Sequence, residues 1–372
     1  MMLKTGLDNI PFPLSKLLAQ VCMQDIRYAA DVFEQIKSPN LYMFNTMLRG
    51  YSVSNDPQKG PALFNCMRAQ NHRQEFLLDQ FTFVSVLKSC SRSLEVWTGL
   101  GVHTVVLKSG FDLFLNVKNA LLHFYCVCGR IPEAHQLFDE LGAMRDLVSW
   151  NTLMGGYLCA SQYDLVVNLF KKLHRDGSAI SLTTALGVLS AVGELRDVSL
   201  GECLHMFCLK VGLLSNLNIV TALISMYGKH CCIYSARRIF DEIDVKKDVV
   251  LWNCLIDVYA KTGFLEEALE LLILMKHDGL HPNSSTLAGL LSACSASGAL
   301  AIGRYVHDYV EEQQLVTYAV AGMVPHHTCP LETAKQLMKE ADYVQCAKKE
   351  AGRSTIESLN NMNDDLLSPL LL

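Results

Sequence analysis

The strongest constraint on the fold of this chain is an internal repeat with a period of 102 residues. The string WNTLMGGY at Trp150 returns as WNCLIDVY at Trp252, and NALLHFY at Asn119 returns as TALISMY at Thr221. The strings VLKSC and LKSGF also have counterparts at the same offset. Because four unrelated strings do not share one offset by chance, the chain is a tandem array.

Each composite unit divides into subunits of 35, 35 and 32 residues, and each subunit has the pattern of two helices. In residues 249–283, apolar residues at helical spacing mark a first helix: Trp252, Leu255, Ile256 and Tyr259. A second set marks the second helix: Leu265, Ala268, Leu269, Leu272 and Met275. Gly263 lies in the turn between them, and Gly279 and Pro282 end the second helix.

One such hairpin cannot bury its apolar face alone, so the hairpins must stack and share a core. A small residue recurs within the second helix, as Ala134, Ala236 and Ala268, where a neighbouring helix must approach closely. We therefore predict an all-α fold of stacked helical hairpins (α-α repeats), with a concave face lined by the first helices.

Composition limits the function classes. Half of the residues are hydrophobic and the net charge is −5, which argues against a protein that binds phosphate in bulk. Fourteen cysteines without any C-x-x-C pair indicate a reducing compartment. No apolar run approaches the roughly 20 residues that span a bilayer, so no membrane partner is expected.

The local strings resemble one family of helical repeats. VSWNTLMGGY from Val148 to Tyr157 and AHQLFDEL from Ala134 to Leu141 are similar to the plant pentatricopeptide repeat (PPR) consensus rather than to the tetratricopeptide one. The alternating lengths resemble the P, L and S motif triplets of the plant-specific PLS subfamily. That resemblance implies a right-handed superhelical solenoid.

The resemblance predicts a tandem PPR array over residues 1–315, with residues 1–10 as the tail of an L motif. Its motifs are S 11–40, P 41–79, L 80–114, S 115–146, P 147–181, L 182–216, S 217–248, P 249–283 and an L motif from residue 284. The first P motif contains a four-residue loop insertion within residues 71–79. KKEAGRSTIE at Lys348 resembles the end of the family's E motif, which predicts a truncated or spliced E-motif remnant over 316–357 and a disordered tail over 358–372.

In PPR proteins the fifth and the last residue of a motif contact one RNA base, and the second residue sandwiches it. Carried over to the P and S motifs, the base-reading pairs are Ser15 with Asn40, Asn45 with Asp79, Asn119 with Asp146, Asn151 with Ser181, Thr221 with Asp248, and Asn253 with Asn283. By the family's correspondence they favour A, U, U, C, G and a pyrimidine, with the N-terminus toward the RNA 5′ end. Apolar fifth residues stand in the L motifs, at Val84, Leu186 and Ala288, so the predicted target is A-U-n-U-C-n-G-Y.

Structural roles compete with this interpretation. Asn near a helix start is also a common capping residue. The second-position residues Tyr42, Val148 and Val250 could equally pack in the core. Lys108 and Lys210, at equal places in successive L motifs, could bind phosphate or could simply be solvated.

No catalytic group is expected, and the chain is predicted not to be an enzyme. Editing members of the subfamily can end in a deaminase-like domain with H-x-E and P-C-x-x-C signatures, and the sequence contains neither. His326, His327 and Cys329 form one short cluster without further ligands, which is a poor zinc site. Neither a metal nor a cofactor is expected.

The resemblance implies a sequence-specific binder of single-stranded organellar RNA, acting in C-to-U RNA editing or in other RNA processing. An editing deaminase or editing cofactor protein would then act in trans. The mitochondrion is favoured over the chloroplast because no targeting peptide is visible and the targeting region is expected to be missing. A helical-repeat scaffold for protein–protein interaction is the alternative, and a non-functional truncated product is a third hypothesis.

Overall fold

The computed structural model describes residues 11–36, 38–71, 78–243 and 245–312. Within these ranges the chain forms eighteen α-helices and short 3-10 turns, and it contains no β-strand. The prediction of an all-α fold is confirmed. No helix in the described ranges is both long enough and apolar enough to cross a membrane.

The helices fall into two compact units, and the boundary along the chain lies between Leu165 and Val166, within α10 (Tyr163–Arg175). The first unit contains α1 (Pro11–Cys22), α2 (Ile26–Glu34), α3 (Leu41–Val53), α4 (Lys59–Asn71), α5 (Gln80–Ser93), α6 (Val96–Lys108), η3 (Phe111–Leu113), α7 (Leu115–Val127), α8 (Ile131–Glu140), η4 (Gly142–Met144) and α9 (Leu147–Cys159). The second unit contains α11 (Leu182–Leu195), α12 (Val198–Lys210), η5 (Leu213–Ser215), α13 (Leu217–Lys229), α14 (Ile233–Glu242), α15 (Val249–Lys261), α16 (Leu265–His277), α17 (Ser284–Ser297) and α18 (Leu300–Glu312).

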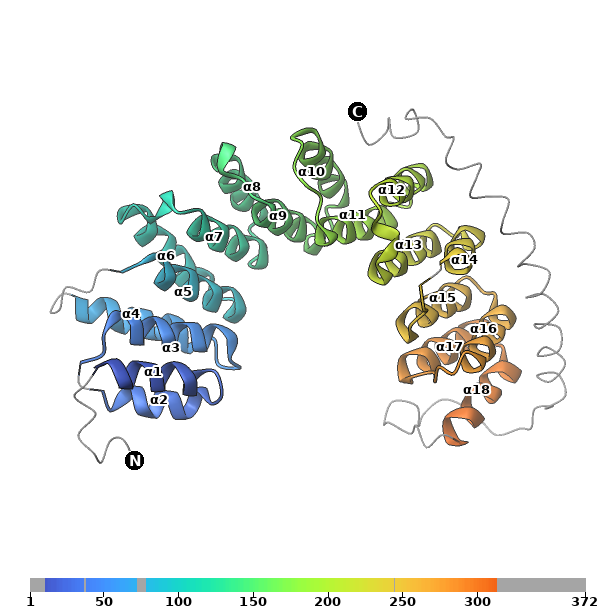
Figure 1. Ribbon diagram of the computed structural model, residues 1–372, viewed down its shortest axis with the longest axis horizontal. Helices are drawn as coiled ribbons and strands as arrows, with labels where there is room; N and C mark the ends of the chain where they lie inside the picture. Colours follow the sequence, from blue (N-terminus) through green and yellow to red (C-terminus); the bar gives the residue numbers. More distant parts are fainter. Residues whose placement is uncertain (1–10, 37, 72–77, 244, 313–372) are drawn as a thin grey trace. The chain divides into compact units, whose positions relative to one another are not determined.

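Successive helices form antiparallel hairpins that stack on one another within each unit (Figure 1). The first helices pack side by side, α3 with α5, α5 with α7 and α7 with α9, and likewise α11 with α13, α13 with α15 and α15 with α17. Second helices pack against the first helix of their own hairpin, as α4 does against α3, α8 against α7 and α16 against α15. The expected stack of hairpins is therefore present in both units, and the handedness of a superhelix through the whole chain stays a prediction.

The hairpin of α15 and α16 shows how the sequence produces this stack. Trp252, Leu255 and Ile256 are buried on one face of α15, as their spacing predicts. Gly263 and Gly279 adopt φ of 90° and 75°, the left-handed conformation that glycine ends a helix with most readily. The predicted turn and the predicted helix end are both confirmed.

The recurring small residue of the second helix lies where two helices approach closely. Ala134, Ala236 and Ala268 are all fully buried. Larger side chains at these positions would force the hairpins apart, because the packed interior leaves no room for extra methylene groups. Their complete burial agrees with the prediction that neighbouring helices approach closely at these alanines.

Polar links join α6 to α7 and α12 to α13, in each case a second helix to the first helix of the next hairpin. His103 Nδ1 shares a hydrogen bond of 2.6 Å with the Tyr125 hydroxyl, and His205 Nδ1 shares one of 3.1 Å with Tyr227. Burial lowers the pKa of both imidazoles and raises the pKa of both phenols, so all four groups are neutral at pH 7. The links therefore connect adjacent repeats without burying charge.

Some sequence predictions lie outside the described residues. They are the L-motif tail at 1–10, most of the inserted loop, the E-motif remnant at 316–357 and the tail at 358–372. The assignment of P, L and S types to the hairpins likewise stays a prediction.

Candidate nucleic-acid interface

The last residue of each predicted P or S motif is the N-cap of the next first helix. Each side chain accepts a hydrogen bond from a backbone N–H in the first turn: Asn40, Asp79, Asp146, Ser181, Asp248 and Asn283. Capping fixes the side chain at the mouth of the helix, because an extended cap residue points its oxygen back toward the helix axis. The capping role that competes with base reading is therefore performed by the last residue of each of these motifs.

The fifth residues lie inside the first helix, beyond the reach of a cap. Asn45 Nδ2 donates to both carboxylate oxygens of Asp79, at 3.0 Å each, and Asn119 Nδ2 donates to Asp146 Oδ1 at 3.1 Å. An ionised carboxylate only accepts hydrogen bonds, so the amide nitrogen must face it. The fifth and the last residue of these two motifs thus form one polar unit, although 34 and 27 residues separate them in the chain.

A hydroxyl that the sequence analysis missed completes each unit. Thr82 Oγ1 donates to Asn45 Oδ1 at 2.7 Å, and Ser149 Oγ donates to Asn119 Oδ1 at the same distance. The hydroxyl residue stands three places after the capping Asp, so the recurring pattern Asp-x-x-Ser/Thr is the signal that could have revealed it. This hydrogen bond fixes the orientation of each amide, with its nitrogen toward the carboxylate.

The last predicted pair has the same arrangement with a second amide in place of the carboxylate. Asn253 Nδ2 donates to Asn283 Oδ1 at 3.1 Å, and Thr286 Oγ1 donates to Asn253 Oδ1. Asn283 Oδ1 also accepts the backbone N–H of Ser285 and Thr286. The amide nitrogen of Asn283 is therefore the part of this cap that remains available to a ligand.

The carboxylate of Asp146 is held in its charged form. Its Oδ1 accepts from Asn119 and from the backbone N–H of Ser149, the latter at 2.8 Å. It also shares the single hydroxyl hydrogen of Ser149, at 2.8 Å, with Asn119 Oδ1. Partial burial alone would raise the pKa of this carboxyl, but these hydrogen bonds together hold the pKa below its usual value. Within the described residues Oδ2 accepts no hydrogen bond, which leaves it as an acceptor beside the Asn119 amide.

The equivalent pair in the second unit is built differently. Thr221 Oγ1 donates to the carbonyl of Leu217 in its own helix at 2.8 Å, so this hydroxyl can only accept at the site. Asp248 Oδ1 accepts from the backbone N–H of Leu251 at 2.8 Å, and Leu251 has no hydroxyl to add. In the described part of the chain no hydrogen bond joins Thr221 to Asp248. This site therefore presents acceptors alone.

The two remaining predicted pairs are Ser15–Asn40 and Asn151–Ser181. Ser15 is buried in α1, at 8% exposure, whereas the other fifth residues are half-buried. Asn151 belongs to the first unit and Ser181 to the second. Ser181 Oγ accepts from the backbone N–H of Thr184 at 3.2 Å and hydrogen-bonds its hydroxyl at 2.8 Å. The roles of these pairs stay predictions.

The second-position residues point away from the core. Tyr42, Val148 and Val250 are 57%, 57% and 60% exposed, so packing in the core does not account for them. They lie three residues before the fifth-position residue and thus on the same face of the helix. Their exposure leaves them free to contact a ligand at that face. The fifth residues of the L motifs carry apolar side chains or a methyl group and bring no donor there: Val84, Leu186 and Ala288.

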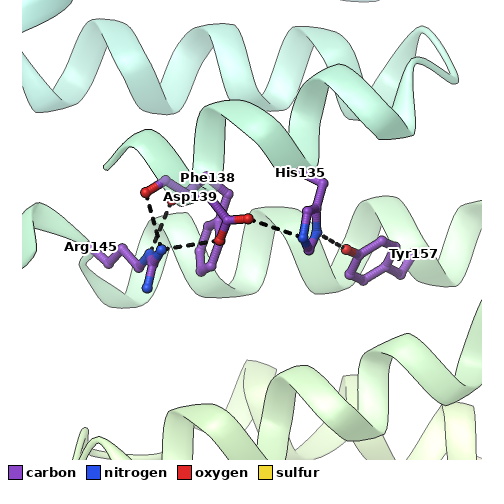
Figure 2. A network of polar contacts seen from close by, with 5 residues as sticks. All are labelled: His135, Phe138, Asp139, Arg145 and Tyr157. Atoms are coloured by element: carbon purple, nitrogen blue, oxygen red, sulfur yellow. Dashed lines mark hydrogen bonds and ion pairs between the residues drawn. The ribbon is translucent and has the colours of Figure 1, made fainter. Parts of the chain in front are cut away.

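A polar network fixes the chain just before Asp146 (Figure 2). Arg145 Nε donates to the carbonyl of Phe138 at 3.0 Å, and its guanidinium carbon lies 4.5 Å from the centroid of the Phe138 ring. Arg145 Nη2 pairs with Asp139 at 3.2 Å, Asp139 pairs with His135, and His135 shares a hydrogen bond with the Tyr157 hydroxyl. The network joins α8 to α9 and so positions the cap between them.

The second unit carries a counterpart of this network, displaced by 102 residues. Arg237 pairs with Asp241 at 2.8 Å and hydrogen-bonds Tyr259, while Lys247 lies 5.0 Å from the Phe240 ring centroid. Phe138 and Phe240 each pack edge-on against the tryptophan of the next first helix, at 4.9 and 4.7 Å between centroids. Both capping aspartates therefore rest on the same kind of support.

In the described ranges no group of three or more His, Cys, Asp or Glu side chains is arranged to hold a metal ion. The cluster of His326, His327 and Cys329 lies outside those ranges.

Comparison with known proteins identifies the repeats. The PPR repeat model matches residues 42–72, 118–144, 148–178 and 219–247, and a second model, PPR repeat family, matches residues 247–296. These matches coincide with the hairpins described above.

Curated relatives carry the same family name. A mitochondrial pentatricopeptide repeat-containing protein of Arabidopsis thaliana is 48% identical over 86% of this chain and 55% of its own length. A chloroplastic one from the same plant is 33% identical over 82% of this chain and 37% of its own length. This chain thus spans about half, or less, of the length of these two relatives.

The chain also resembles a solved structure, that of pentatricopeptide repeat protein PPR10 in complex with an 18-nucleotide psaJ RNA element. The match covers 99% of this chain and 62% of the PPR10 chain, with 16% sequence identity and a TM-score of 0.43. On the repeat matches and the named relatives, the chain belongs to the pentatricopeptide repeat family.

Proposed function

We propose that this chain binds single-stranded RNA in a sequence-specific manner and carries no catalytic group of its own. The observation that carries the proposal is the pairing of fifth and last residues into polar units, as at Asn45–Asp79, Asn119–Asp146 and Asn253–Asn283. A cap needs only the last residue, so capping does not explain why the fifth residue joins it. Bases of single-stranded RNA are recognised along their Watson–Crick edges by such side chains.

The Asn119–Asp146 unit matches the edge of uracil. It offers a donor, the second Nδ2–H of Asn119, beside an acceptor, Asp146 Oδ2. Uracil presents the complement, an O4 acceptor beside the N3–H donor. Cytosine would place the lone pair of N3 against the carboxylate, so the unit should reject it. At Asn45–Asp79 the amide nitrogen donates to both carboxylate oxygens, so the assignment of uracil to this unit rests on the resemblance to the family.

The Thr221–Asp248 site matches guanine. The hydroxyl of Thr221 is committed as a donor to its own helix, and Asp248 is a second acceptor. Guanine presents two donors side by side, N1–H and the exocyclic amino group. Adenine has a bare N1 in place of the N–H, which would meet a carboxylate. Two acceptors at one site therefore favour G over A.

The remaining P and S pairs extend the target. At Asn253–Asn283 both amide nitrogens are available as donors, and the family's correspondence assigns this pair a pyrimidine. Ser15–Asn40 and Asn151–Ser181 are assigned A and C by the resemblance to the family. With unread positions at the L motifs, the proposed target is 5′-AUNUCNGY-3′, with the N-terminus of the protein at the RNA 5′ end.

The proposed setting is a plant organelle, and the mitochondrion in particular. A relative 48% identical to this chain is named as mitochondrial, and the chloroplastic relative is less similar. We further propose that the bound RNA is a site of C-to-U editing, with the deaminase or an editing cofactor protein supplied in trans. The predicted PLS organisation and the predicted E-motif remnant are the basis of that step.

A binding selection from a random RNA pool tests the proposal without presupposing the target. Enrichment of sequences related to 5′-AUNUCNGY-3′ supports it. A parallel selection from a peptide library tests the alternative, a protein-binding scaffold. Tight, sequence-selective peptide binding together with no enrichment of any RNA would replace RNA binding with that alternative.

A further inference from the structure

The ninth residue of each predicted motif lies one helical turn beyond the fifth. In α3, α5 and α7 this ninth residue is Arg49, Lys88 and His123. The second, fifth and ninth residues of a motif share one face of a helix, because their spacing is three and then four. In these three first helices a cationic or imidazole side chain therefore stands on the base-reading face, next to the fifth residue. We call Arg49, Lys88 and His123 the ninth-residue stripe.

All three side chains are exposed, and the residues directly before and after each one are buried. Within the described ranges none of the three side chains forms an ion pair or a hydrogen bond. Several cations elsewhere in the array are paired, as in Arg130–Glu133 and Lys229–Glu194, where the latter pair is 2.7 Å apart. The stripe is therefore positive charge that no carboxylate of the described chain neutralises.

The three residues stand at equal places on neighbouring helices. Their helices pack side by side, α3 with α5 and α5 with α7. Surrounding protein atoms lower the pKa of His123, and the positive charge of Lys88 lowers it further. The two side chains are thus close enough to interact, and His123 offers a neutral N–H donor at pH 7.

The second unit has no such stripe. Its ninth residues are Ser190, Ser225, Asp257 and Ser292, and Asp257 is paired with Lys261 at 2.7 Å. The first helix between the two groups, α9, has Gly155 at this place. At the ninth position, positive charge is thus confined to Arg49 and Lys88 on two adjacent helices of the first unit, with the neutral imidazole of His123 on the next first helix.

We propose that the ninth-residue stripe binds the phosphate groups of the RNA whose bases are read by the fifth and last residues of the same helices. This inference rests on the proposed function and adds a division of labour to it. Given the orientation of the RNA, the first unit holds the backbone of the 5′ part by charge. The second unit reads bases with no cationic phosphate contact from this position.

The division has a measurable signature in the salt dependence of binding. Each phosphate that a cation neutralises on single-stranded RNA contributes roughly 0.7 to the slope of log K against log salt concentration. Arg49 and Lys88 carry full charges, so replacing both should reduce the magnitude of that slope by about 1.4. Base discrimination at the 3′ part of the target should not change.

The experiment compares the full chain with two double variants on a labelled 5′-AUNUCNGY-3′ oligoribonucleotide. Arg49→Gln with Lys88→Gln removes the stripe charges. Arg27→Gln with Arg68→Gln is the matched control, because it removes two exposed charges from α2 and α4, which are second helices of the same unit. The expected result is a shallower slope for the stripe variant only. Equal slopes for the two variants, with helical content intact by circular dichroism, would overturn the proposal and leave sequence-specific binding in place.

A second measurement places the contacts on the RNA. Uncharged methylphosphonate linkages in the 5′ half should reduce the slope for the wild-type chain and change it little for the stripe variant. The same linkages in the 3′ half should act equally on both proteins. Equal effects of the two halves on the wild type would contradict the stripe. If the wild type binds none of these RNAs at any salt concentration, the proposed function fails, and the inference fails with it.

Discussion

The sites at Asn119–Asp146 and Thr221–Asp248 occupy equal places in successive repeats, yet they present different edges. Both aspartates cap the next first helix, and both follow a cation that lies over a buried phenylalanine. The polar edge differs because Asn119 donates to Asp146, whereas Thr221 turns its hydroxyl into its own helix. The comparison teaches that two features vary independently: the packing that supports the capping aspartate, and the donors and acceptors that the pair presents to a base. The same scaffold can hold a donor–acceptor pair or two acceptors.

The largest test removes the shared support. Phe138→Ala and Phe240→Ala each delete a buried ring that packs edge-on against a tryptophan, so each should lower the free energy of unfolding by about 3–5 kcal/mol. Urea unfolding followed by circular dichroism measures both losses. Tyr234→Ala, at a side chain 94% exposed, is the control and should change stability by less than about 0.5 kcal/mol. A loss at one phenylalanine only would show that the two sites are supported differently.

The next test changes the hydrogen-bonding group that faces the base and leaves the packing beneath it unchanged. Asp248→Asn replaces an acceptor with a group that can donate to the bare N1 of adenine, so preference should move from G toward A at one RNA position. A good base-specific contact is worth about 1–3 kcal/mol. Binding titrations against four RNAs that differ at that base measure the change. A shift at other positions as well would mean that Asp248 acts on the fold rather than on one base.

The caps themselves should differ in strength. Asp146→Ala should cost about 0.5–2 kcal/mol of stability, and more than Asp248→Ala, because it also removes the acceptor of the Asn119 amide nitrogen. The pKa of Asp146 is lowered in the folded chain, so its contribution is present at neutral pH and is lost as the pH falls below about 4. Urea titrations of wild type and Asp146→Ala should converge over that range. A gap that persists unchanged at pH 3 would contradict the assignment.

The smallest effect is expected at the hydroxyl that orients the amide. Ser149→Ala removes the donor to Asn119 Oδ1 and should weaken the preference for uracil there by about 0.5–1.5 kcal/mol. The same four-RNA titration, with the varied base opposite Asn119, measures it. Unchanged discrimination would show that the carboxylate alone orients the amide.

The fold was predictable because the residues that determine each hairpin recur from one repeat to the next. Apolar spacing around Trp252, a small residue such as Ala236 and a glycine such as Gly263 act locally, and each repeats in the next hairpin. The candidate pairs were predictable only through the resemblance to the family. Nothing in the local spacing of Asn119 and Asp146 shows that they meet, since the contact depends on how one hairpin stacks on the next.

The parts that sequence reasoning missed depend on the same stacking. Ser149 was not singled out, although its place after Asp146 repeats in other motifs, because its partner lies in another helix. Ser15 is buried although its motif position predicts a base contact, and α1 packs against α2 and α3 with no preceding hairpin among the described residues. The 57% exposure of Tyr42 shows that it does not pack in the core, which its residue type alone could not show.

The most direct test of base reading is a reciprocal exchange of the two fifth residues. Asn119→Thr should turn the first site into two acceptors, and Thr221→Asn should build a donor beside Asp248. Titrations of the wild type and both variants against RNAs with all four bases at the two positions should show U exchanged for G at the first and G for U at the second. Equal affinity of the folded wild type for all four bases at both positions would contradict the account.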